Sequence, residues 1–275
     1  MLKLLKDHWL NRRIEHARAV RVTFTGGLGA QVLSTAIYLH FVDRGFQTLA
    51  DLSYFENPHT IATPGRKGQL SHWQWEMDGY GFSRANLNTH LPQGMSLPTL
   101  HDGALKLSMA LRALASTSVR ARFDVSASDQ YSALYRDTEL LGQRYVCIHV
   151  RRGDYLNVAS HLINSNTIDN LACKFYNLVD RVLILSDSPV DLDEFTRVRS
   201  TFQGRVHIID SNPDPVLAHS LMRNASILVC SNSQFSLSAG LLSDGLKIIP
   251  KIWFAEADEH LNRIVDSISD FAVVR

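Results

Sequence analysis

The sequence contains few cysteines and almost no excess charge. Cys147, Cys173 and Cys230 are widely separated among 275 residues, and an odd, scattered set is typical of reduced thiols in a cytosol rather than of a disulfide framework. The formal net charge is +1, which argues against bulk electrostatic attraction to nucleic acid. We therefore expect no nucleic-acid partner, whereas a small anionic ligand needs only a local basic patch.

Long apolar runs are also missing. The sequence has no apolar stretch of about 18 residues, and its first residues lack the apolar core of a signal peptide, so we expect a cytoplasmic protein. Residues 1–18 combine leucines, Trp9 and Ile14 with lysines and arginines. This pattern fits a basic amphipathic helix in peripheral contact with the inner face of a membrane, and it also fits a helix packed on its own domain.

Short β-branched runs alternate with helical periodicity along much of the chain. This alternation predicts an α/β protein whose parallel sheets are covered on both faces. Two lobes, residues 1–142 and 143–275, would enclose a cleft. We expect strands at 19–25, 46–52, 145–150, 182–185, 206–209, 227–230 and 246–249; helices at 32–42, 104–115, 169–178, 215–224, 235–242 and 256–267, with one more starting near 192; and loops over 54–103.

A glycine-rich turn follows the first expected strand. It reads TGGLGAQ, and Gly27, Gly29 and Gln31 are candidates for donor binding because glycine lets backbone N–H groups approach a phosphate at a helix start. Val32 replaces the third glycine of the dinucleotide fingerprint, and no lysine follows as in a P-loop. A tight strand-to-helix turn is the structural alternative.

Two arginines follow the strand at 145–150. Strand alternation places His149 and Arg151 on one side and Arg152 on the other. Guanidinium groups at the carboxyl end of a buried strand suit a phosphate, because ligands bind at that edge of α/β sheets. The alternative is a structural ion pair, for which Asp154 is a candidate partner.

Two further turns carry polar residues after buried strands. Ser233 is placed to cap the helix at 235–242, and it could also bind a phosphate together with Gln234 and Phe235. Asp187 could bind ribose hydroxyls or the N–H edge of guanine, or it could form a helix-entry turn.

No feature of the sequence predicts a metal site or a cofactor. Asp191 and Asp193 form a D-x-D pattern, but they open a helix, where carboxylates favour the positive end of the helix dipole without any metal. The Cys and His spacing is not that of a zinc site. In the loop-rich region, aromatic and acidic residues either bind an acceptor sugar or pack as buried side chains: His72, Trp75, Glu76 and Asp78.

Taken in order, these segments resemble the α-1,2-fucosyltransferase family. The matching segments are GGLGAQ at 26–31, DLSYF at 51–55, HVRRGDY at 149–155, LSD at 185–187, NSQFSLS at 232–238 and PKIWF at 250–254. The resemblance implies a GT-B fold with two Rossmann-like lobes, a GDP-sugar held mainly by the C-terminal lobe, inversion at the sugar carbon and no metal. Ala30 replaces the family's asparagine, and Leu237-Ser238 replaces a tryptophan pair.

The resemblance implies transfer of L-fucose from GDP-L-fucose to a galactose-like hydroxyl of a glycan or lipid-linked oligosaccharide, as in O-antigen biosynthesis. Arg151 would neutralise the leaving diphosphate, assisted by Arg152 and the loop at Ser233, and Asp154 belongs to the same catalytic motif. His72, Glu76 and Asp78 are candidate proton acceptors. Two alternatives remain: transfer of another GDP-deoxysugar such as colitose, and a non-catalytic module that binds a GDP-sugar or carbohydrate.

Overall fold

The chain forms two compact α/β units. The computed structural model describes residues 2–56, 74–90, 96–101, 103–125, 129–153, 156, 162–210, 214–250 and 271–274. Its contacts divide the chain into Met1–Phe123 and Asp124–Arg275. Each unit contains a parallel sheet, as the sequence predicts.

The division falls earlier than the expected boundary at 142/143. Helix α7 (Asp129–Asp137) contacts α10 (Pro215–Arg223), and the hydroxyl of Tyr135 lies 2.7 Å from that of Tyr145. The segment that precedes residue 143 therefore packs with the second unit.

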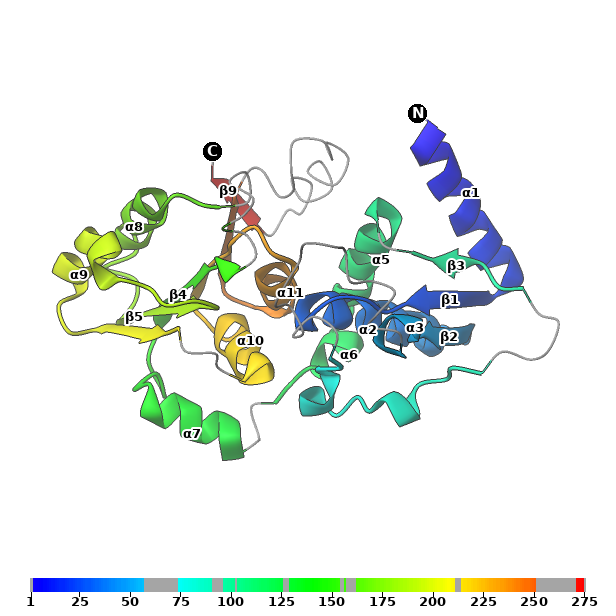
Figure 1. Ribbon diagram of the computed structural model, residues 1–275, viewed down its shortest axis with the longest axis horizontal. Coiled ribbons are helices and arrows are strands. Elements are labelled where there is room, and N and C mark those ends of the chain that lie inside the picture. Colours follow the sequence, from blue (N-terminus) through cyan, green and yellow to red (C-terminus); the bar gives the residue numbers. More distant parts are fainter. Residues whose placement is uncertain are drawn as a thin grey trace. The chain divides into compact units, whose positions relative to one another are not determined.

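The first unit is built on a three-stranded sheet in the order β2-β1-β3 (Figure 1). Strands β1 (Ala19–Thr23) and β2 (Gln47–Asp51) confirm two predicted strands with slightly shorter bounds. Strand β3 (Thr99–Leu100) lies where we expected only loops, and two residues are too few to show a period.

Helix α2 (Leu28–Asp43) is buried along most of its length, because it contacts β1 and β2 on one side and α5 on another. The other helices of this unit are α1 (Leu2–Ala17), α3 (Ser53–Glu56), η2 (Met77–Tyr80), η3 (Arg84–Asn86), α5 (Ala104–Leu114) and α6 (Thr117–Ala121). None of the helices in the described parts of either unit is long and apolar enough to span a bilayer.

The second unit has a six-stranded parallel sheet in the order β6-β5-β4-β7-β8-β9. Counted from its own first strand, this is the 3-2-1-4-5-6 order of doubly wound nucleotide-binding sheets, and the strand order reverses between β4 and β7. Strand β9 was not predicted. The strands are β4 (Tyr145–Val150), β5 (Arg181–Ser186), β6 (Val206–Ile209), β7 (Ile227–Val229), β8 (Leu246–Pro250) and β9 (Phe271–Val274).

Helices cover both faces of this sheet. Val146, Ile148 and Val150 of β4 pack in one core cluster with residues of α8 and α9, whereas the Tyr145 hydroxyl donates to the Leu221 carbonyl of α10 on the other face (2.6 Å). Successive β4 side chains thus alternate between the two faces. The covering helices are α8 (Ser165–Cys173), η6 (Leu192–Phe195), α9 (Thr196–Phe202), α10 and α11 (Gln234–Leu242).

Helix α8 corrects one prediction. It begins at Ser165 rather than 169, because the Asn164 side chain accepts a hydrogen bond from the backbone N–H of Asn166 and caps the first turn. It ends at Cys173 rather than 178. The predicted helix at 256–267 lies outside the described residues.

All three cysteines are free thiols. Burial raises the pKa of the Cys147 thiol and raises that of Cys230 to about 12. Both thiols therefore stay protonated at neutral pH and are poor nucleophiles.

Candidate functional site

Polar residues that follow β4 and β7 meet at the position where the strand order reverses. Nδ1 of His149, at the end of β4, lies 2.7 Å from Oγ of Ser231, which follows β7. Both residues are buried. Since ligands of doubly wound sheets bind at the carboxyl ends of the strands at this switch point, this edge is the candidate site.

His149 is held as a neutral imidazole. Burial, followed by the nearby charge of Arg151 and by His219, lowers its pKa to about 3. At neutral pH the ring therefore acts as a hydrogen-bonding group without positive charge, one nitrogen donating and the other accepting.

Arg151 is paired with the residue that the strand register places opposite it. His149 pairs with Leu185 in the ladder of β4 and β5, and two residues further along Nη1 of Arg151 lies 2.7 Å from Oδ2 of Asp187. The side chains are 18% and 23% exposed. The guanidinium is thus held by a carboxylate at the sheet edge and is partly exposed.

Asp187 also receives a second hydrogen bond. Its Oδ1 accepts from the backbone N–H of Arg152 at 2.8 Å. Both carboxylate oxygens therefore fix the loop after β4, a role that differs from the predicted binding of ribose or guanine and from the alternative helix-entry turn.

Arg152 takes a different carboxylate. Its Nη2 forms an ion pair with Oε2 of Glu194, and its Nη1 donates to the carbonyl of Pro189 at 3.3 Å. Ser165 donates to the same Glu194 oxygen at 3.0 Å, and the hydrogen bond from Arg152 lowers the pKa of Glu194. These contacts connect the loop to α8 and η6. Arg152 and Arg151 therefore bind different carboxylates.

Gly153 allows this loop to pass close to Asp187. Its φ of +23° lies in the left-handed region, and a Cβ there would lie 2.6 Å from Oδ2 of Asp187. Any side chain at this position would therefore press on the carboxylate that holds Arg151.

The turn after β7 is a compact network of hydroxyl groups. Ser233 caps α11 by accepting from the backbone N–H of Ser236 at 3.3 Å, and Ser231 donates to the Ser233 hydroxyl at 3.2 Å. The predicted cap is confirmed. Asn232 is also buried, and its Oδ1 has no hydrogen-bond partner among the described residues.

Ser231, Asn232 and Glu194 were not among the predicted site residues. The first two belong to an unbroken polar stretch between a buried strand and an apolar helix, and that signal could have found them. The role of Glu194 could not be predicted from the sequence, because its partner Arg152 is 42 residues away.

Two residues of the late segment differ in exposure. Gln234 is exposed, while Phe235 is half-buried and its ring lies between His149 and His219, with centroid distances of 5.5 and 5.4 Å. Nε2 of His219 lies 2.9 Å from Oγ of Ser238, and burial lowers the pKa of His219 to about 3. Ser238, which replaces a tryptophan of the resembled family in the sequence, is thus engaged by His219.

The glycine-rich turn belongs to the first unit. Gly26 has a φ of +70°, Gly27 is the N-cap of α2, and Gly29 is buried in the first turn. Fully buried Gln31 donates through Nε2 to the carbonyls of Gly26 (2.9 Å) and Gln74 (2.8 Å).

Oε1 of Gln31 accepts from the backbone N–H of Glu76 at 2.9 Å. Gln31 thus fastens residues 74–76 to the turn, which supports the structural interpretation of this motif more directly than ligand binding.

The candidate acceptor residues are not equivalent. The Trp75 indole donates to the Phe82 carbonyl at 2.9 Å and packs against Phe24, with centroids 5.7 Å apart, so it contributes to the core. Glu76 is half-buried and Asp78 is exposed on η2. His72, like Asp154 of the arginine loop, lies outside the described residues.

The D-x-D carboxylates serve the local structure. Asp191 caps η6 by accepting from the backbone N–H of Asp193 at 2.9 Å, and Asp193 pairs with Arg199. Among the residues that the structure describes, no three metal-ligating side chains cluster together.

Comparisons with known proteins are distant. No protein-family model matches the chain, and no curated protein matches it in sequence. Among solved structures, the chain is similar to POFUT1 in complex with GDP-fucose, with 11% identity and a TM-score of 0.42 over 82% of this chain and 94% of that one.

It is also similar to the glycosyl transferase family 9 protein from Veillonella parvula DSM 2008, with 10% identity and a TM-score of 0.48 over 93% of this chain and 85% of that one. Likeness at this level assigns neither a ligand nor a reaction to the chain.

Proposed function

We propose that the protein is a GT-B glycosyltransferase that moves L-fucose from GDP-L-fucose to a galactose-like hydroxyl of a glycan or lipid-linked oligosaccharide, forming an α-1,2 linkage. The observation that carries the proposal is the position of Arg151. It is held by Asp187 at the carboxyl end of β4, the strand at which a nucleotide-binding strand order reverses. His149 of the same strand lies 2.7 Å from Ser231, in the turn that precedes α11.

The proposed donor site uses two sources of positive charge. The Arg151 guanidinium can make two charge-assisted hydrogen bonds to a diphosphate, and the N-terminus of α11 offers backbone N–H groups near Gln234 and Phe235. Buried Asn232 adds a hydrogen-bond acceptor for an N–H or O–H group of the donor. A nucleoside diphosphate sugar matches this combination of cation, amides and acceptor.

In the proposed reaction the acceptor oxygen attacks C1 of fucose from the face opposite the diphosphate. The bond from C1 to the diphosphate oxygen breaks, and GDP leaves with the electron pair. Arg151 stabilises the negative charge that develops on the leaving group, which is the largest single contribution expected for such a group. Neutral His149 does not compete with Arg151 for the anion.

In this proposal the hydroxyl proton passes to a carboxylate or an imidazole. Glu76, Asp78 and His72 are the candidates. We assign Arg152 a supporting role, because its guanidinium is already engaged by Glu194 and Pro189. No metal or cofactor takes part in this scheme.

A different GDP-deoxysugar such as colitose is the second candidate donor. It is favoured by the replacement of the tryptophan pair, since Leu237 and Ser238 are smaller than tryptophan and buried, and Ser238 is hydrogen-bonded to His219. This change would alter how the deoxysugar ring fits against Phe235.

A direct test incubates the protein with GDP-L-fucose, GDP-colitose or GDP-mannose and with galactose-terminated acceptors, and detects products by mass spectrometry. We expect one deoxyhexose to be added from GDP-L-fucose, and NMR to identify an α-fucoside. A β-fucoside would contradict inversion. GDP binding without transfer to any acceptor would instead support the non-catalytic module.

A further inference from the structure

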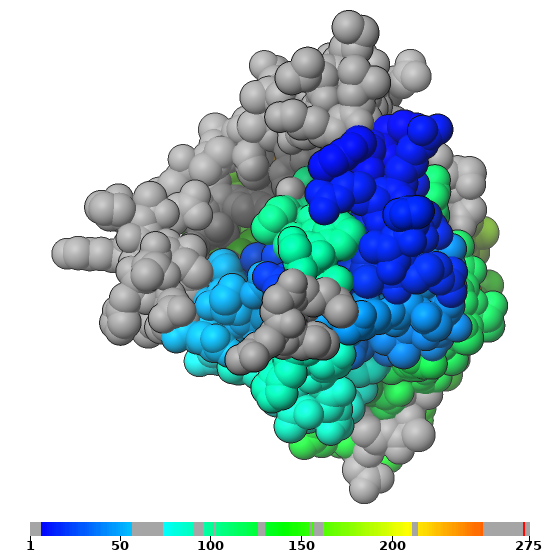
Figure 2. All heavy atoms as spheres, turned by 90° about the vertical axis from the view of Figure 1, so that its right-hand side faces the viewer, coloured from blue at the N-terminus to red at the C-terminus, as the bar shows by residue number. Residues whose placement is uncertain are grey.

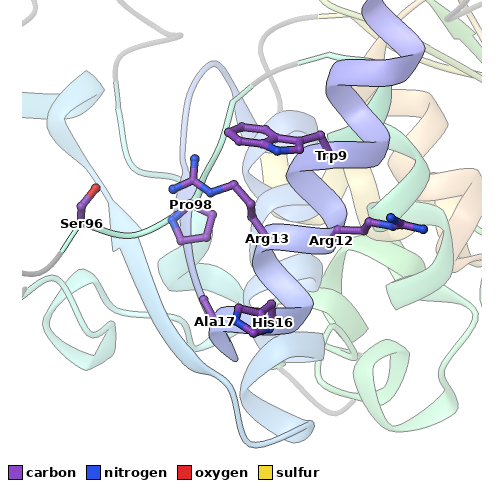
Figure 3. Close-up of a pocket in the computed structure, with 7 residues that line it drawn as sticks. All are labelled: Trp9, Arg12, Arg13, His16, Ala17, Ser96 and Pro98. Carbon is purple, nitrogen blue, oxygen red and sulfur yellow. The ribbon is translucent and has the colours of Figure 1, made fainter.

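A second surface of interest lies on helix α1 of the first unit. Figure 2 shows α1, in dark blue, at the surface of the molecule. An open depression of about 400 Å³ is lined there by Trp9, Arg12, Arg13, His16, Ala17, Ser96 and Pro98 (Figure 3). Trp9 is 59% exposed, although an indole of this size usually lies in a core or an interface.

One cation lies against the exposed indole, and a second extends from the same helix. The guanidinium carbon of Arg13 lies 4.6 Å from the centre of the Trp9 ring, and Arg12 extends from the helix in the opposite direction (Figure 3). Neither arginine has a carboxylate partner in the described parts of the chain. Glu15, by contrast, is held by both guanidinium nitrogens of Arg44 at 3.1 Å.

The whole helix carries an excess of positive charge. Its sequence contains four lysines and arginines against two carboxylates, Asp7 and Glu15. Arg44 engages Glu15, and Arg12 and Arg13 are both exposed.

The surface is also fixed in place. Ile14 is fully buried and anchors α1 to the unit, and the Pro98 carbonyl accepts from the backbone N–H of Arg21 in β1 at 2.9 Å. The packed face and the exposed face of α1 therefore coexist, and the exposed side chains are presented on a rigid support.

We propose that this surface docks the protein on a bilayer that contains anionic phospholipids. Tryptophan is favoured at the level of lipid headgroups, arginines near an anionic surface gain electrostatic attraction, and the guanidinium fork matches a phosphate. In this arrangement Trp9 enters the headgroup layer while Arg12 and Arg13 contact lipid phosphates. The inference does not depend on the proposed transfer reaction.

A bilayer explains the indole, whereas a soluble phosphate would use only the arginines. A second copy of the chain would need acidic groups opposite Arg12 and Arg13, and the exposed face of α1 is itself basic, so two copies of this face would repel each other. Charge complementarity therefore favours the anionic membrane.

The test measures flotation of the full chain with vesicles of phosphatidylcholine alone and of phosphatidylcholine with phosphatidylglycerol. We expect binding only to the anionic vesicles, weakened by added salt. The double variant R12Q/R13Q should bind about fivefold more weakly for each arginine removed. Trp9→Ala should also weaken binding, and the Trp9 fluorescence, obtained by subtracting the Trp9→Phe spectrum, should shift to the blue on anionic vesicles.

The matched control is R112Q/R136Q, which removes the same charge from two exposed positions on α5 and α7. It should bind like the unmodified protein, and thermal melts should show that all variants are folded. Turnover with a soluble acceptor should be unchanged in the α1 variants, so this proposal and the transferase proposal fail separately.

Equal binding of R12Q/R13Q and the unmodified protein would overturn the proposal, as would equal binding to neutral vesicles. Absence of vesicle binding would also overturn it. Inorganic phosphate binding lost in R12Q/R13Q would then indicate a soluble anion, and self-association lost in the same variant would indicate a second copy.

Discussion

Oδ2 of Asp187 lies 2.7 Å from Nη1 of Arg151. The two residues follow neighbouring strands and face each other because the ladder of β4 and β5 continues in register beyond its last pair, Val150 with Ser186. The carboxylate of one strand end thus orients the guanidinium of the next. We regard Asp187 as the residue that positions Arg151 for the proposed diphosphate.

Asp187→Asn should lower turnover while leaving the protein folded. The amide keeps the size and one acceptor of the carboxylate but loses the charge-assisted bond to Arg151. Such a bond is worth about 1.5–3 kcal/mol, or roughly 10- to 150-fold in rate if the guanidinium is displaced in the transition state. Steady-state kinetics with GDP-L-fucose would measure the change.

Asp180→Asn is the matched control. Asp180 pairs with Arg144 at the amino end of the same two strands, where both side chains are largely exposed. Its replacement should leave turnover unchanged. Equal losses in both variants would show that Asp187 acts through general stability.

Gly153→Ala should reduce turnover through the same contact. The added methyl would lie 2.6 Å from Oδ2 of Asp187, so the carboxylate must move away from Arg151. Gly142→Ala is the control, because Gly142 also has a positive φ, +74°, but open space around its Cβ position. We expect both variants to lose about 1 kcal/mol of stability, and only Gly153→Ala to lose activity.

Acid should destabilise the fold through two buried histidines. The pKa values of His149 and His219 are lowered to about 3, below the ordinary value of about 6.5. Protonation therefore favours the unfolded state. The stability that the two neutral histidines contribute is fully present above about pH 6.5 and is lost as the pH falls toward 3. At about pH 5 each buried histidine should lower the free energy of unfolding by roughly 2 kcal/mol relative to neutral pH.

Urea unfolding at several pH values would check this dependence. His219→Asn should be less stable at neutral pH but should lose less stability on acidification. His101→Asn, at an exposed position, should keep the original pH dependence. An unchanged dependence in His219→Asn would contradict the assignment.

Much of the second unit was predictable because buried parallel strands have a plain signature. The runs at 145–150 and 206–209 are short, β-branched and bounded by polar turns, and both strands have the predicted bounds. Strand β3 is only two residues long, and α8 begins at a side-chain cap before its apolar residues. Neither feature produces a periodic pattern.

Part of the geometry of the candidate site was predictable from the sequence, but the pairing of its residues was not. Strand alternation separated Arg151 from Arg152, as their different partners confirm. Their partners Asp187 and Glu194 could not be paired with them from the sequence, because adjacency of β4 and β5 depends on the strand order of the folded sheet. The role of Gln31 as a tether could not be predicted either, because it depends on hydrogen bonds to residues 74–76, which are distant in the sequence.

Turnover should not require a divalent metal. Asp191 caps a helix and Asp193 pairs with Arg199, so the D-x-D carboxylates already have structural partners. Activity in EDTA should equal activity with Mg²⁺ or Mn²⁺. Loss of activity in EDTA that either ion restores would show that a metal binds the diphosphate.

The most direct test of the account is the transfer rate of Arg151→Lys under saturating GDP-L-fucose. Lysine keeps the charge but not the planar fork that binds two phosphate oxygens. We predict that Arg151→Lys and Arg151→Ala both lose at least about two orders of magnitude in turnover, while folded Arg152→Lys loses less. Circular dichroism and thermal melts establish folding first. Near-normal turnover of folded Arg151→Lys would contradict the bidentate role of Arg151 and make Arg152 the better candidate.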